Sequence, residues 1–229
     1  MSRKLSLAWY LYKKQMIWVL WFIGVMFIIQ ATIFFFNPYD TSNNINFLEN
    51  IFGAACIFML ITGLLTSQVY FKHFIKNGIT RKEYFISSTI AAVDLSLSIV
   101  LLSTVITIFF KIVSQLTGFT ATISSLSFLE TSSFWIAHIF SLSLIIMCYY
   151  VGGWAVGIGI IKLNKIKRNL FIAFNFLFLS FVNLLWKSRL EFTVINFNIN
   201  FPNLTLLGSI FATMFLISVV LYWMRKLIK

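Results

Sequence analysis

The sequence predicts an all-α, polytopic membrane protein that forms a single domain over residues 1–229, with about six transmembrane helices. Hydrophobic residues make up 60% of the chain and charged residues only 10%, whereas a soluble domain carries about 25% charged residues. The chain also contains six apolar runs of the length, about 20 residues, that a helix needs to cross a bilayer core of about 30 Å.

Each predicted helix is bounded by polar or basic residues at the ends of one apolar run. Both prolines, Pro38 and Pro202, fall between the runs, which leaves every helix without a proline kink. The predicted spans are residues 16–36, 51–71, 85–110, 134–161, 170–186 and 204–224.

Residues 1–15, ahead of the first span, show one apolar helical face. Leu5, Ala8, Trp9 and Tyr12 follow the i, i+3, i+4, i+7 spacing. Aromatic and lysine side chains suit the headgroup region, which favours an interfacial helix on the inner leaflet. A straight extension of the first span is the alternative.

The basic residues predict the orientation. Cytoplasmic segments of membrane proteins collect Lys and Arg, and with both termini in the cytoplasm only Lys111, Lys187 and Arg189 lie outside. The net charge of +12 is therefore explained by topology, and no nucleic-acid partner is predicted. The fifteen inner residues are Arg3, Lys4, Lys13, Lys14, Lys72, Lys76, Arg81, Lys82, Lys162, Lys165, Lys167, Arg168, Arg225, Lys226 and Lys229.

Motifs of hydrolytic enzymes are missing from the sequence. It has no Gly-rich phosphate loop ending in Lys and Ser or Thr, and no serine-protease elbow. His73 and His138 fall on opposite predicted sides, which rules out a zinc-protease pair. We therefore predict a protein that is not an enzyme, with no catalytic, cofactor-binding or metal-binding residues of its own.

The inner segment between the second and third spans carries helix stop and start signals. Gly78 can adopt the left-handed conformation that ends a helix. Thr80 can cap the next helix, with Glu83 completing a capping box. A short helix is expected to begin at Arg81, giving a sharply defined cytoplasmic elbow, and an ordinary helix hairpin is the alternative.

The sequence of this elbow, Gly-Ile-Thr-Arg-Lys-Glu-Tyr-Phe from Gly78 to Phe85, resembles the matching phrase of small bacterial ABC-2-type ABC transporter permeases. The inner-leaflet helix, the six spans and the inner termini are similar to that family's plan over nearly the whole chain. In the family, the segment matching residues 79–85 is a coupling helix that inserts into a separate ATP-binding subunit. The resemblance implies contact residues Gly78, Ile79, Thr80, Arg81, Lys82, Glu83 and Tyr84.

The resemblance also implies the partners and the location. Separate ATPase subunits would bind ATP and Mg²⁺, and a second permease, identical or related, would complete the pathway across the bacterial cytoplasmic membrane. Within the outer segment 187–203, the loop around residues 197–203 resembles the family's re-entrant gate, and the composition resembles Gram-positive exporters of amphipathic peptides, including the phenol-soluble modulin exporter. The implied second cytoplasmic contact is Lys162, Lys165, Lys167 and Arg168.

Two other functions remain open. One is the six-span substrate-binding subunit of a vitamin uptake system, which also relies on other proteins for ATP but needs no capped elbow. The other is a non-transporting membrane assembly or sensor protein.

Asp94 is the single acid predicted within the hydrocarbon, where an unpaired charge costs on the order of 3 kcal/mol. It is interpreted either as a latch or part of a translocation path, or as a side chain that bonds to Ser96, Ser98 or a neighbouring helix, or as a residue at a shallower position than the span boundaries suggest.

Small and amide residues in the later spans predict helix contacts. Gly153 and Gly157 form a face that permits close helix approach, either within the chain or at a dimer seam. Asn175 and Asn183 are candidates for hydrogen bonds between helices.

Overall fold

The protein is described by a computed structural model over residues 3–36, 47–117, 135–186 and 206–228. Within these ranges all regular structure is helical, which confirms the all-α prediction. Six stretches are long and apolar enough to cross a membrane. The elements are α1 (Arg3–Phe36), α2 (Phe47–Leu65), the π-helix η1 (Thr66–Tyr70), α3 (Phe71–Lys76), α4 (Arg81–Thr117), α6 (Trp135–Lys162), α7 (Lys165–Trp186) and α8 (Leu206–Ile228).

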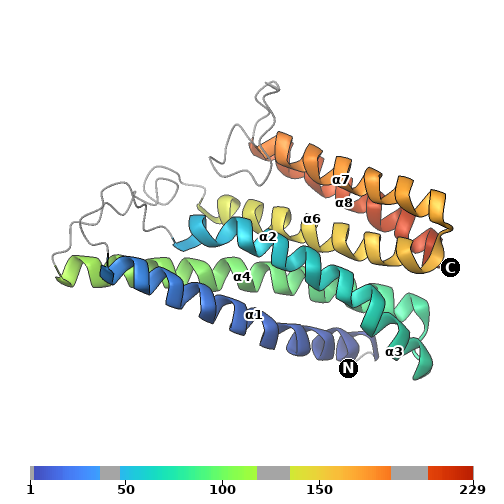
Figure 1. The fold of residues 1–229 in the computed structure, drawn as a ribbon, viewed down its shortest axis with the longest axis horizontal. Coiled ribbons are helices and arrows are strands. Elements are labelled where there is room, and N and C mark those ends of the chain that lie inside the picture. Colours follow the sequence, from blue (N-terminus) through green and yellow to red (C-terminus); the bar gives the residue numbers. More distant parts are fainter. Residues whose placement is uncertain (1–2, 37–46, 118–134, 187–205, 229) are drawn as a thin grey trace.

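The helices form an elongated bundle with α6 at its centre (Figure 1). Helix α6 packs against α2, α4, α7 and α8, while α1 packs mainly against α4. Residues 141–155 of α6 are buried all around the helix. A helix that is apolar on every face and covered on every face belongs to the core of a helix bundle.

Helices α2 and α6 approach so closely that side chains are excluded from their contact. A Cβ atom on Gly153 would clash with the backbone carbonyl of Leu60, and one on Gly63 would clash with the carbonyl of Tyr150. The glycine face predicted for the fourth span therefore packs within the chain, as small residues do at close helix crossings.

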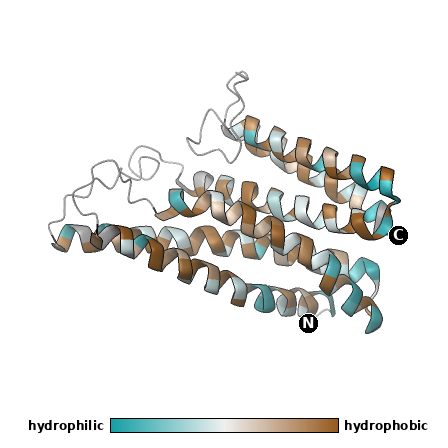
Figure 2. Cartoon of the chain, viewed as in Figure 1, coloured by the Kyte–Doolittle hydropathy of each residue, from teal (hydrophilic) through white to brown (hydrophobic). Residues whose placement is uncertain are grey.

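The predicted inner segments meet at one end of the bundle. The start of α1, the α3–α4 connection, the α6–α7 connection and the end of α8 lie together there (Figure 1). Figure 2 shows hydrophilic residues concentrated at this end, with hydrophobic residues along the middle of the helices. We call this the basic end.

Several predicted boundaries differ from the structure. Helix α1 runs without a break from Arg3 to Phe36, so residues 1–15 do not form a separate helix where they are described, and the straight extension is what the structure shows. The predicted coupling helix at 79–85 is likewise not separate, because α4 continues from Arg81 to Thr117. The predicted re-entrant gate around residues 197–203 lies outside the described residues.

Candidate functional site

The elbow between α3 and α4 is built by backbone hydrogen bonds that stop one helix. Gly78 has a φ of 77°, a conformation open to glycine at little cost. Its N–H donates to the carbonyl of Ile75 at 3.2 Å, and the N–H of Ile79 donates to the carbonyl of Phe74 at 3.1 Å. These two bonds form a Schellman motif, which confirms the predicted role of Gly78.

The first turn of α4 is closed by the predicted capping box. The Glu83 N–H donates to the Thr80 hydroxyl at 3.2 Å, and the Thr80 N–H donates to the Glu83 carboxylate at 3.2 Å. The Thr80 hydroxyl also donates to that carboxylate at 2.8 Å. Helix α4 therefore begins at Arg81 as predicted, with the N–H groups of Thr80 and Glu83 satisfied by the box.

The side chains of the elbow divide between the surface and the core. Arg81 and Lys82 are exposed, and Ile79 is half-buried. Tyr84, predicted as a contact residue for a partner, is fully buried instead. Its hydroxyl donates to the backbone carbonyl of Thr66 at 2.6 Å, so Tyr84 ties the elbow to η1.

Thr66 of the π-helix η1 lies at the centre of a polar cluster that the sequence did not reveal. The Gln15 amide donates to the Thr66 hydroxyl at 2.8 Å, and the Tyr150 hydroxyl lies 3.0 Å from the same oxygen. All three side chains are buried. With Tyr84 they form a polar hub, which joins α1, η1, α4 and α6.

The hub explains why the helix is irregular here. The carbonyl of Thr66 accepts from the N–H of Phe71, five residues on, and from Tyr84, and such π-turns occur often at functional sites. The extra residue in the turn places Phe71 and Phe74 on the buried side, while His73 stays exposed. A buried polar group needs its partners, and η1 supplies them.

The N-terminal part of α1 braces the elbow from the other side. The Ser87 hydroxyl donates to the backbone carbonyl of Lys4 at 2.8 Å. Farther from the basic end, the Tyr12 and Ser98 hydroxyls lie 2.9 Å apart. The start of α4 is thus held by both α1 and η1.

The second predicted cytoplasmic contact is the short connection between α6 and α7 at the same basic end. Lys162, Lys165 and Lys167 are exposed there, and Arg168 is half-buried. Helix α6 links this connection to the elbow, because Trp154 stacks on Phe85 of α4 with ring centroids 5.1 Å apart.

The polar residues predicted within the spans behave differently from one another. Asn183 exchanges hydrogen bonds with the Tyr149 hydroxyl across α6 and α7, the shorter at 2.8 Å. Among the described residues, the Asn175 amide bonds to the carbonyl of Phe171 in its own helix rather than to another helix. Asp94 lies exposed on α4, and in the described part of the chain its carboxylate bonds neither to Ser96 nor to Ser98.

Comparison of the chain with protein-family models, curated proteins and solved structures gives no match. Among the described residues, no group of three or more His, Cys, Asp or Glu side chains could hold a metal ion. The capped elbow with its buried hub is the best-defined polar feature of this part of the molecule.

Proposed function

We propose that this chain is a permease subunit of an ATP-binding cassette exporter in the bacterial cytoplasmic membrane. In this proposal the basic end faces the cytoplasm, where separate ATPase subunits bind ATP and Mg²⁺ and engage the elbow. A second permease, identical or related, completes the pathway, and amphipathic peptides are the substrate class that the sequence resemblance suggests.

One observation carries the proposal: the elbow is both exposed and firmly connected to the membrane helices. Arg81 and Lys82 are exposed at its tip, while Tyr84, on the same turn of α4, is anchored in the polar hub. A partner that pushes on the tip would therefore move α4 and η1 together. Rigid elements that are held by packing and hydrogen bonds transmit such displacements better than free loops.

Through the polar hub, a displacement of the elbow would also reach α1 and α6. Thr66 contacts Gln15 of α1 and Tyr150 of α6. Transport needs at least two arrangements of the helices with different contacts. In this proposal the hub, with its π-turn, moves together with the elbow between these arrangements.

The vitamin-uptake subunit and the assembly or sensor protein are the alternatives. Neither requires a capped and anchored elbow between α3 and α4. The presence or absence of a bound ATPase separates both from the exporter.

The test is co-purification of the tagged chain with its co-expressed gene neighbours in mild detergent. Arg81→Glu combined with Lys82→Glu should abolish recovery of an ATPase while leaving membrane insertion unchanged. Arg225→Glu combined with Lys226→Glu is the matched control, because it reverses two exposed charges at the same end, outside the elbow. The control should retain the ATPase, and a wild-type chain that recovers none would refute the exporter proposal.

A further inference from the structure

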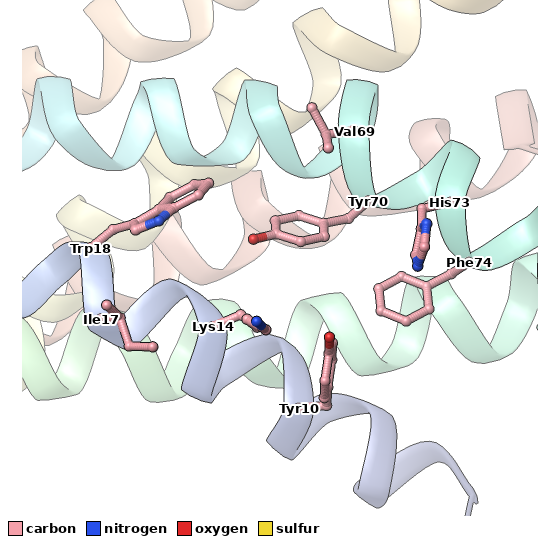
Figure 3. Close-up of a pocket in the computed structure, with 8 residues that line it drawn as sticks. All are labelled: Tyr10, Lys14, Ile17, Trp18, Val69, Tyr70, His73 and Phe74. Atoms are coloured by element: carbon pink, nitrogen blue, oxygen red, sulfur yellow. The ribbon is translucent and has the colours of Figure 1, made fainter.

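A cleft of about 430 Å³ opens between α1 and the η1–α3 segment, beside the elbow. Figure 3 shows its eight lining residues, and most of its walls are aromatic. Tyr10 meets Phe74 edge-on with ring centroids 5.9 Å apart, and Trp18 lies 6.2 Å from Tyr70. Lys14 extends into the space between these rings (Figure 3).

The chemistry of the cleft changes along its length. Lys14, Tyr10 and His73 supply hydrogen-bond donors in the part of the cleft nearer the basic end. Ile17 and Val69 line the part farther along the bundle, and both are more than half exposed. The cleft is therefore polar and cationic toward one end and apolar toward the other.

Lys14 makes an anionic ligand more favourable than a cationic one. An aromatic cleft without a charge would suit a quaternary ammonium group, through cation–π attraction. Here the cleft already contains an ammonium group, and Lys14 lies 6.0 Å from the centroid of the Tyr10 ring. None of the eight lining residues is acidic, so a second cation would be repelled and an anion attracted.

We propose that this cleft binds an anionic phospholipid, with the phosphate at Lys14 and an acyl chain along Ile17, Trp18 and Val69. Basic pockets between membrane helices on the cytoplasmic side recognise such headgroups, and tryptophan and tyrosine suit the headgroup depth. The lipid would bridge α1 and η1, two elements that also meet in the polar hub. The proposal stands whether or not the chain binds an ATPase.

Tryptophan quenching in vesicles tests the site directly, because Trp18 lines the cleft. The purified chain is reconstituted in phosphatidylcholine with increasing brominated phosphatidylglycerol, and in a parallel series with brominated phosphatidylcholine. The Trp18 signal is the difference between the wild type and Trp18→Phe. We expect phosphatidylglycerol to quench this signal at a lower mole fraction than phosphatidylcholine does.

Lys13 provides a matched control for Lys14. Both are exposed, but Lys13 lies over the Trp9 ring, 5.2 Å from its centroid, and does not line the cleft. Lys14→Gln should raise the half-quenching mole fraction of phosphatidylglycerol about fivefold, the factor for losing one hydrogen-bonded contact to the phosphate. Lys13→Gln should change it less than twofold, and circular dichroism should show unchanged helix content in both.

Three results would overturn the site. Equal quenching by the two brominated lipids would mean that only bulk lipid contacts Trp18. An equal shift in the two lysine variants would mean that general surface charge, rather than the cleft, attracts the lipid. An unchanged half-quenching mole fraction in Lys14→Gln would show that Lys14 does not bind the phosphate.

Discussion

At the scale of single residues, Tyr84 links the exposed elbow to the interior of the bundle. Its hydroxyl donates to a carbonyl inside η1, and its ring meets Phe71 edge-on with centroids 5.4 Å apart. A phenylalanine ring would fill nearly the same space, so the hydroxyl contributes mainly through its hydrogen bond. Removing the hydroxyl therefore measures how much this hydrogen bond contributes to stability.

Tyr84→Phe should destabilise the chain by about 0.6–2 kcal/mol, the range for hydrogen bonds between membrane helices. Tyr70→Phe is the control, because the Tyr70 ring also packs beside Phe74 and its hydroxyl forms no hydrogen bond in the described part of the chain. Thermal unfolding in detergent measures both variants. Equal losses would show that the Tyr84 hydroxyl contributes nothing specific.

The sequence predicted residues whose partners are close along the chain. Thr80 and Glu83 are three residues apart, so the capping box is visible in the sequence and is confirmed in the structure. Gln15 and Tyr150 are separated by most of the chain, and nothing local indicates that they share Thr66. A polar triplet, residues 66–68, interrupts the second apolar run and was the one available signal.

At the scale of elements, composition predicted the helices better than their ends. Apolar run length set the six spans, but it could not show that α1 extends back to Arg3 or that α4 extends forward to Thr117. Polar residues continue a helix readily when neighbouring helices cover one side of it. Leu7 and Leu11, within the predicted interfacial segment, are buried in the bundle.

The close contact between α2 and α6 leads to a prediction about the stability of the chain. Gly153→Ala should destabilise the chain by about 1–3 kcal/mol, the usual cost of overpacking, because the added Cβ would meet the Leu60 backbone. Gly24→Ala in α1 is the control, since no atom lies within 4 Å of its added Cβ. Alanine there should be neutral or stabilising by up to about 1 kcal/mol through helix propensity.

Unfolding of both glycine variants in the same detergent provides the measurement. The two substitutions add the same methyl group to a helix, so their difference reports the packing alone. A Gly153→Ala protein as stable as Gly24→Ala would mean that α2 and α6 can separate without cost.

At the scale of the whole molecule, the fold separates charge from apolar surface. The four predicted inner segments reach one end of the bundle although they are far apart in the sequence (Figure 1). Alternating helix directions bring this about, because each helix returns the chain to the opposite end. Asp94 is an exception to the separation, since α4 carries it about 20 Å from Arg81 at 1.5 Å per residue.

In the proposed membrane arrangement, the Asp94 carboxylate needs either a proton or a partner beyond the described part of the chain. A carboxylate at this depth faces a protein interior or a water-filled path far more often than lipid, and here it lies exposed on α4. A second subunit or the transport pathway would then cover this face. Asp94→Asn should leave insertion unchanged and the stability of the isolated chain within about 0.5 kcal/mol of wild type, as is usual for substitutions of exposed residues.

In the proposed exporter complex, transport by the same variant should fall. Asp94→Glu is the control, because it keeps the charge and should keep most of the transport. The two readouts separate the possible roles: a loss of stability in the isolated chain would indicate an intrachain partner, whereas a loss confined to transport would place the carboxylate at the covered face. Unchanged transport with Asp94→Asn would remove Asp94 from the mechanism.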